Sequence, residues 1–233
     1  MTHSVKRLFV YMVLLFACIN LYAASDAFTI NSDGEQVRFA EANLSVDAVL
    51  PNTADFHLFG WSGKSRYTVT DFYGVSFVRA NGAYAGDFLD WGNLQTDGEW
   101  RTLTAEEWIY ILTGRNNADD LCEETEKDGQ RGLAIWPDSA KVKDINTAVF
   151  LPYQGYRDGT DIVQEGEVGY YWTATSNDSK QATYINININ QKTGVSTDRY
   201  RGCSVRLVQS VCQVPVQISV NDETMGKVIF KPQ

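Results

Sequence analysis

The stretch Gly169-Tyr170-Tyr171-Trp172-Thr173-Ala174-Thr175 decides the fold, together with Tyr184-Ile185-Asn186-Ile187-Asn188-Ile189-Asn190 and Gly202-Cys203-Ser204-Val205-Arg206-Leu207-Val208. In the middle stretch, apolar and polar side chains alternate strictly. Because successive side chains of a strand point to opposite faces of a sheet, we expect the three isoleucines to enter a core and the three asparagines to project outward. A row of amides on a rigid sheet indicates a recognition surface. It equally suits a soluble sheet face that discourages aggregation.

Short connections surround this strand. A strand at 183–190, a turn at 191–194, a strand near 195–200 and a strand at 203–208 predict three consecutive antiparallel strands. Trp172 is expected in the core and Arg206 as a buried hydrogen-bonding fork.

The chain before residue 161 also gives shorter local signals. Residues 28–30 and 36–39 flank an Asp33-Gly34 step, which predicts a hairpin. Glycine beside tryptophan at 58–61 and 90–93 indicates close packing of backbone against a large ring. Residues 148–152 predict a further strand, and residues 155–160 predict a turn.

One helix stands out at 105–113. Thr104 and Glu107 have the spacing of a capping box, Trp108, Ile111 and Leu112 share one face, and Gly114 is a stop signal. The following segment, 116–132, is rich in carboxylates. It lacks the ordered spacing of calcium loops, so we expect a solvated acidic loop or a short exposed helix.

The N-terminus has the layout of a secretory signal peptide. Lys6 and Arg7 precede an apolar run, and small residues follow at Ala23-Ala24-Ser25, which predicts a signal at 1–24. The run is short for a membrane anchor. Lipidation at Cys18 is an alternative, although Phe16 fits a lipoprotein processing site poorly. We therefore expect export to the medium or to the outer cell surface.

Composition narrows the classes of partner. Removal of Lys6 and Arg7 takes the formal charge from −9 to −11, which argues against binding to nucleic acid or to an anionic membrane. About 210 remaining residues fit one domain, or one domain and a fragment. The aromatic residues, 12 % of the chain, suffice for a sizeable core.

The chain offers little for metal or thiol chemistry. After signal removal Cys122, Cys203 and Cys212 remain, and their spacing does not select a disulfide. Cys203 is expected to be an inert buried thiol. With His57 as the only remaining histidine, the sequence predicts no metal and no cofactor.

Several motifs in order carry a family resemblance. They are residues 28–44, Trp100 to Trp108, Phe150-Leu151-Pro152 with Gly155-Tyr156-Arg157, Gly169 to Trp172, and Ser204 to Val208. Together, over residues 28–209, they resemble the exported bacterial "major paralogous domain" family, named from Fibrobacter and abundant in Bacteroidetes. The resemblance implies an α+β, C-type lectin-like domain, mostly antiparallel β with one or two helices, long loops and paired termini, here at 26–212.

The fold class alone does not fix a function. Calcium-dependent lectins use a Glu-Pro-Asn or Gln-Pro-Asp tripeptide with a Trp-Asn-Asp, and the chain has neither. Formylglycine-generating enzymes of this fold use two cysteines, but Cys203 stands where the family usually has an aromatic residue, and Cys212 lies beyond the last strand. The carboxylate pairs at 106–107 and 119–120 diverge instead of facing each other. We expect a non-enzymatic recognition module that binds a glycan or an extracellular protein without calcium.

The expected ligand-binding residues share polar or tyrosine side chains on the final sheet and its turns, a mixture typical of antibody paratopes. They are Thr173, Ser176, Asn177, Asp178, Tyr184, Asn186, Asn188, Asn190, Arg199 and Tyr200.

The tail at 213–233 resembles the first hairpin of a bacterial surface β-repeat. About twenty residues bury no core of their own. The alternative function is therefore a structural component of a surface assembly or adhesin, with a strand that pairs with a partner.

Overall fold

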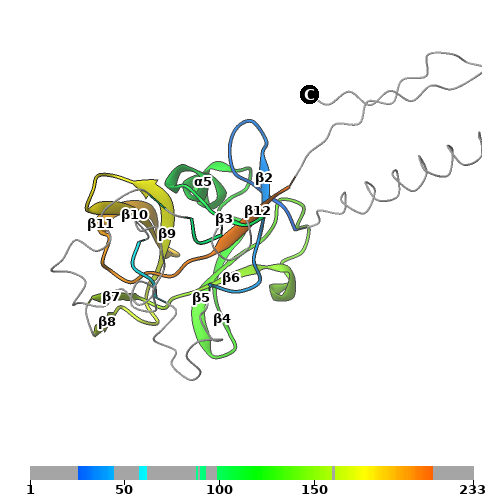
Figure 1. The fold of residues 1–233 in the computed structure, drawn as a ribbon. Helices are drawn as coiled ribbons and strands as arrows, with labels where there is room; N and C mark the ends of the chain where they lie inside the picture. Colours follow the sequence, from blue (N-terminus) through cyan, green and yellow to red (C-terminus); the bar gives the residue numbers. More distant parts are fainter. Residues whose placement is uncertain are drawn as a thin grey trace, which may run out of the picture.

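The computed structural model describes residues 26–44, 58–61, 88, 90–92, 99–158 and 161–211. These form an α+β arrangement of antiparallel sheets with a single short α-helix among the described residues (Figure 1). The expectations for the signal peptide, Cys18, His57, Cys212 and the tail lie outside this part of the chain.

A terminal sheet joins the two ends of the described chain. Its strands are β1 (Phe28–Thr29), β2 (Gln36–Phe39), β12 (Leu207–Val211) and β3 (Arg101–Thr102), in the order β1-β2-β12-β3. The predicted hairpin at 28–39 and the paired termini are confirmed. The prediction that the last strand continues the sheet of residues 183–200 is wrong, because β12 pairs with β2 and β3 instead.

A central sheet has the order β11-β10-β9, from β9 (Gly169–Ser176), β10 (Gln181–Asn188) and β11 (Gln191–Asp198). The predicted alternation is confirmed for Ile185 and Ile187, which are fully buried, but Ile189 is 43 % exposed. The turn lies at 189–190 and not at 191–194 as predicted. The backbone N–H of Asn190 donates to Oδ1 of Asn188 at 2.9 Å, an Asx-type bond that ends the strand.

A third sheet packs against the other two. It contains β4 (Cys122–Lys127), β5 (Gln130–Ile135) and β6 (Val149–Pro152), with a short 3-10 helix, η3 (Ile145–Thr147), before β6. The acidic segment is therefore a hairpin from Cys122 on, preceded by turns at 116–121, and the expected loop or helix over the whole segment is wrong. Asp128 and Gly129 both have positive φ, as a tight two-residue hairpin turn requires. The strand prediction at 148–152 is confirmed, and the turn prediction at 155–160 falls on a small hairpin, β7 (Tyr156–Asp158) and β8 (Asp161–Val163).

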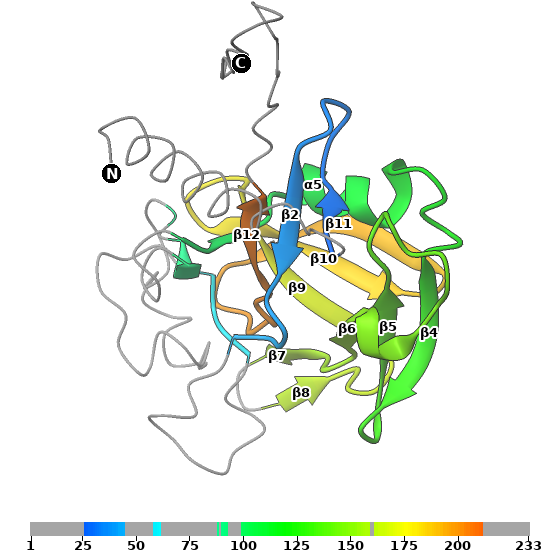
Figure 2. The same cartoon turned by 90° about the vertical axis from the view of Figure 1, so that its right-hand side faces the viewer.

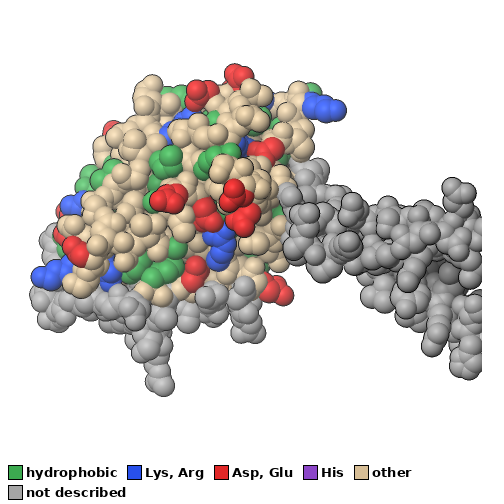
Figure 3. Space-filling model, turned by 90° about the horizontal axis from the view of Figure 1, so that it is seen from above, with side chains coloured by type: hydrophobic (Ala, Val, Ile, Leu, Met, Phe, Trp, Pro, Cys, Tyr) green, Lys and Arg blue, Asp and Glu red, His purple; other side chains and the backbone are tan. Residues whose placement is uncertain are grey.

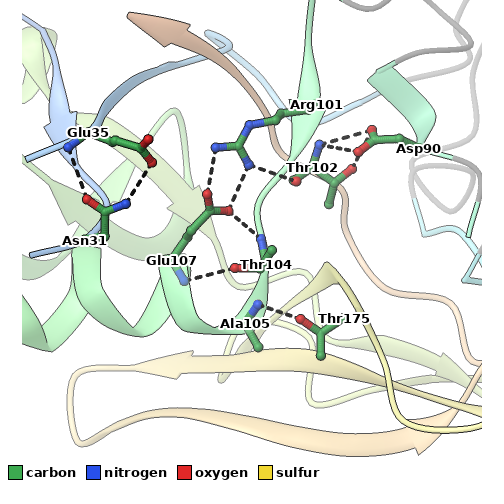
Figure 4. Close-up of polar contacts among 9 residues, drawn as sticks. All are labelled: Asn31, Glu35, Asp90, Arg101, Thr102, Thr104, Ala105, Glu107 and Thr175. Carbon is green, nitrogen blue, oxygen red and sulfur yellow. Dashed lines mark hydrogen bonds and ion pairs between the residues drawn. The ribbon is translucent and has the colours of Figure 1, made fainter. Parts of the chain in front are cut away.

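The helix α5 (Ala105–Ile109) begins with the predicted capping box and continues as a π-helical turn, η2 (Tyr110–Gly114). Thr104 Oγ1 accepts from the N–H of Glu107, and the Glu107 carboxylate accepts from the N–H of Thr104. The same carboxylate receives two bonds from Arg101, at 2.8 and 2.7 Å (Figure 4). The N–H of Ala105 donates to Thr175 Oγ1, so the helix start is tied to the central sheet.

Two apolar clusters lie on opposite faces of the central sheet. Tyr171, Ile185 and Ile187 pack with Trp108 of α5 and with the terminal and third sheets. On the other face, Tyr170, Trp172 and Tyr184 pack with Phe59, Trp61, Trp91 and Cys203. The predicted packing role of the glycine–tryptophan segments is confirmed for these described residues. Tyr184 on this face of β10 is therefore covered, whereas Asn186 and Asn188 are half-buried and Asn190 is exposed.

Arg206 is the predicted buried fork. It is 2 % exposed, and its guanidinium donates to Asn43 Oδ1 and to the carbonyl oxygens of Ala40 and Phe150. Burial lowers its pKa. This one side chain thus connects the segment after β2 to β6.

The surface seen in Figure 3 carries acidic side chains, with lysines and arginines scattered among them and not gathered into one patch. Within the described residues, no helix is both long enough and apolar enough to span a membrane.

Candidate functional site

Three tyrosines form a continuous stack across the face of the central sheet opposite α5. The rings of Tyr184 and Tyr170 meet edge to face with centroids 5.0 Å apart, and those of Tyr170 and Tyr156 do so at 4.9 Å. Such geometry adds about 0.5–1.5 kcal/mol per pair beyond burial. We name the group Tyr156, Tyr170, Tyr184, Asn186 and Arg201 the tyrosine face; Tyr170 and Tyr184 are its buried part, and the other three side chains are half-buried.

The hairpin of β7 and β8 carries Tyr156 to this face, at one end of β9 (Figure 2). Arg157 and Gly202 exchange backbone hydrogen bonds at 2.7 and 2.9 Å, which fix β7 beside the segment that follows β11. A Cβ at Gly202 would lie 2.9 Å from the Cβ of Arg157 and 3.0 Å from the Leu58 oxygen. Glycine at 202 is therefore required for this close approach.

Arg201 closes one end of the stack. Its guanidinium carbon lies 5.1 Å from the centre of the Tyr156 ring, within the range of a cation–π contact. Its Nη2 is 3.7 Å from a carboxylate oxygen of Asp158. The Nε–H of Arg201 is buried and has no acceptor. A donor of positive character thus remains available beside an aromatic ring.

Asn186 lies on the same face, opposite Tyr170 in the sheet register. Its Nδ2 donates to Oε1 of Gln191 at 3.4 Å, whereas its Oδ1 is buried without a donor. An unsatisfied buried acceptor costs about 1–3 kcal/mol. A ligand group that donates to this oxygen would recover that free energy.

The phenols of Tyr170 and Tyr184 are neutral donors at physiological pH. Burial raises the pKa of Tyr170 to about 12 and also raises the pKa of Tyr184. The Tyr170 hydroxyl donates to Oε1 of Gln164, a residue with φ of 58°. A non-glycine residue in this left-handed region costs roughly 1 kcal/mol or more, and such strain concentrates at functional sites.

The structure distributes seven of the ten predicted ligand-binding residues over three places. Ser176, Asn177 and Asp178 are exposed at the β9–β10 turn, and Asn188 and Asn190 lie at the other end of β10. An eight-residue strand separates these ends by roughly 25 Å. Tyr184 and Asn186 lie on the tyrosine face between them.

Three predicted residues have structural contacts. Thr173 is fully buried, and its hydroxyl donates to the Thr183 carbonyl at 2.7 Å. Arg199 is 3 % exposed, stacks over the Trp61 ring at 4.2 Å and donates to the backbone oxygen of Asp178. Tyr200 is half-buried and hydrogen-bonded to Arg201. Only Tyr184 and Asn186 of the ten therefore belong to the stacked surface.

Sequence reasoning did not select Tyr156, Tyr170 or Arg201. Tyr170 could have been found, because it has the same parity as Trp172 in β9 and so shares its face. No local pattern places Tyr156 or Arg201 there, since the Arg157–Gly202 pairing joins distant parts of the chain.

The two described cysteines are free and buried. Burial raises the pKa of both Cys122 and Cys203, which keeps them as protonated thiols. The predicted burial of Cys203 is confirmed. Within the described ranges, no group of three or more His, Cys, Asp or Glu side chains is placed to hold a metal ion.

No family model, curated protein or solved structure matches the chain. The tyrosine face therefore has to be interpreted from its own geometry.

Proposed function

We propose that this protein is a non-enzymatic recognition module, exported to the medium or the outer cell surface, which binds a glycan or an extracellular protein on the tyrosine face without calcium. The observation that carries the proposal is the Tyr156–Tyr170–Tyr184 stack, flanked by the unpaired Oδ1 of Asn186 and the unpaired Nε–H of Arg201. Both atoms are buried but belong to half-buried residues, so a ligand would satisfy them once their side chains turn toward it.

The chemistry of this surface suits recognition. Tyrosine gives contact area with little loss of conformational entropy, and arginine and tyrosine are enriched among residues that dominate binding energy. Tyr170, Tyr184 and Asn186 lie on β9 and β10 and Tyr156 lies on β7, so strands hold four of the five side chains, while Arg201 lies in the bend after β11. A rigid surface loses less entropy on binding.

Within the same proposal, residues 26–212 form a C-type lectin-like domain of the exported bacterial paralogous family. Paired terminal strands, a helix that follows the N-terminal strands in sequence and a separate three-stranded sheet support this assignment. The signal at 1–24, a lipid anchor at Cys18 and a repeat-like tail at 213–233 remain proposals drawn from the sequence.

An oxidase mechanism through Cys203 has a specific observation against it. The thiol is fully buried, and its raised pKa disfavours the thiolate that binds copper or acts as a nucleophile.

The test is an array of host and dietary glycans and extracellular proteins, probed with calcium and with chelator. Wild type is compared with Asn186→Ala, Tyr156→Ala and the control Tyr110→Phe, a half-buried tyrosine of η2. The proposal expects a hit that survives chelation, weakens in the first two variants and persists in the control. A blank array, or a hit that chelator abolishes, would contradict it.

A further inference from the structure

Among the described residues, no strand pairs with the outer edge of β11. β11 is the outermost strand of the central sheet, eight residues long, and its other side pairs with β10 along its whole length (Figure 1). An edge of this kind presents a row of unpaired N–H and C=O groups, which is a template for another strand.

The register identifies which groups point outward. The N–H of Trp172 donates to the Ser204 carbonyl, so the backbone of Trp172 is turned away from β10. Its partner Tyr184 must then direct its groups to β11, where it faces Val195. Because the direction alternates along a strand, Gly194 and Ser196 on either side of Val195 point their N–H and C=O groups outward. In the described part of the chain, no residue bonds to the outward groups of these two.

The features that usually guard an edge are missing from the middle of β11. Proteins protect edges with charged side chains, proline or bulges. The one lysine, Lys192, is turned away: its side chain is 9 % exposed and its Nζ lies 3.6 Å from Asp119. Gly194 and Ser196 are exposed and small.

We propose that the chain forms a twofold dimer by antiparallel pairing of β11 with the β11 of a second copy, centred on Val195. In this register the sequence Gln191-Lys192-Thr193-Gly194-Val195-Ser196-Thr197-Asp198 is self-complementary. Lys192 faces Asp198 of the second copy, Thr193 faces Thr197, and Gly194 faces Ser196. Threonine pairs are favourable across strands, and the Lys192 ammonium, which contacts Asp119 in the same copy, would have Asp198 of the second copy as a further carboxylate opposite it.

The edge strand of the third sheet shows the contrast. β4 reads Cys122-Glu123-Glu124-Thr125-Glu126-Lys127. Each antiparallel self-pairing centred on Glu124, on Thr125 or between them places glutamate opposite glutamate, which is unfavourable. The sequence of β4 therefore opposes self-association, whereas the sequence of β11 permits it.

The dimer would double the recognition surface. A twofold axis that relates antiparallel edge strands is perpendicular to the sheet, so both tyrosine faces would lie on one side of a continuous sheet. A ligand repeated on a surface would then be bound by two sites at once, with a gain from effective concentration. The dimer itself rests on β11 alone; only this consequence depends on the proposed function.

The test is sedimentation equilibrium of the full chain expressed with its own N-terminal segment, from low to about 100 μM, since dimerisation depends on concentration. Ser196→Pro removes an outward N–H and blocks the edge. Asp198→Lys places lysine opposite Lys192 of the second copy. Glu126→Pro, at an exposed position on the β4 edge, is the matched control.

We expect a concentration-dependent dimer that both β11 variants weaken at least about tenfold and that the control leaves unchanged. Amide hydrogen exchange on wild type needs no variant: the N–H groups of Gly194 and Ser196 should exchange more slowly as concentration rises. A monomer throughout the range, a dimer indifferent to both β11 variants, or exchange independent of concentration would each overturn the proposal. Loss of the dimer in Ser196→Pro with intrinsic ligand affinity retained would separate this inference from the proposed function.

Discussion

The ion pair of Arg101 with Glu107 gives the most quantitative prediction. The substitution Glu107→Gln keeps an acceptor for the capping box, since glutamine serves at this position. It replaces the double contact between Arg101 and a carboxylate, at 2.8 and 2.7 Å, by a single hydrogen bond from Arg101 to a neutral amide oxygen. The substitution thus isolates the ion pair from the cap.

The magnitude follows from burial. Hydrogen bonds to charged groups contribute about 1.5–3 kcal/mol each, but the side chains of Arg101 and Glu107 are 32 % and 18 % exposed, so solvent screens the pair. With one neutral bond retained, we expect a loss of about 1–2 kcal/mol in unfolding free energy at pH 7. For a urea dependence of about 2 kcal/mol/M, the midpoint falls by about 0.5–1 M.

The dependence on pH follows from the carboxylate. Burial alone would raise the pKa of Glu107, but the hydrogen bonds from Arg101 and Thr104 outweigh it and hold the pKa below its ordinary value. A lowered native pKa stabilises the protein above the unfolded pKa, and this contribution disappears as pH falls through the native pKa. The difference between wild type and Glu107→Gln should therefore be full at pH 7 and shrink below about pH 4.

The assay is urea denaturation followed by tryptophan fluorescence at pH 7 and at acid pH, with Thr104→Ala as a comparison. Loss of the Thr104 cap should cost about 1 kcal/mol at both pH values. Equal midpoints for wild type and Glu107→Gln at pH 7, or a difference that persists unchanged in acid, would refute the reasoning.

Three further predictions follow from single positions. Gly155→Ala should lower the thermal unfolding midpoint more than Gly129→Ala. Both glycines have positive φ, but a Cβ at Gly155 would lie 2.2 Å from the Val163 oxygen, whereas a Cβ at Gly129 would meet open space. Equal falls in the midpoint would contradict this. Cys122 and Cys203 should resist a thiol reagent in the native state and react on unfolding, because both thiols are buried with raised pKa; rapid native labelling of either would be inconsistent. Arg206→Lys should lower the free energy of unfolding by about 2–4 kcal/mol, because an ammonium does not reproduce the fork to Asn43 and Phe150. An unchanged urea midpoint would exclude the fork as a stabilising element.

The sequence predicted the features that depend on near neighbours. The capping box of Thr104 and Glu107 and the hairpin at 28–39 are encoded within a few residues, so local chemistry sufficed. The end of β10 was misplaced because Ile189 continues the alternation. The turn is set instead by the Asn188 side chain. Gly194, which was predicted to be part of the turn, lies within β11, where a Cβ would come within 3.9 Å of the Ala105 Cβ of α5.

The acidic hairpin shows a local signal that was outweighed. The Asp128-Gly129 step marks the turn, but the density of carboxylates around it suggested a solvated loop. Long-range features had no local signal at all. β12 pairs with β2 across the whole chain, and Tyr156 reaches the tyrosine face only through the Arg157–Gly202 pairing.

The central claim is that the tyrosine face binds the ligand, and the most direct test is the affinity of Tyr156→Ala for the strongest array hit, measured by titration calorimetry in chelator. Tyr156 is half-buried and ends the stack, so its ring is the part of the face that a ligand can reach. We predict at least about 30-fold weaker binding, as expected for a dominant contact, with Tyr110→Phe within about twofold of wild type. Equal affinity of wild type and folded Tyr156→Ala would contradict the claim.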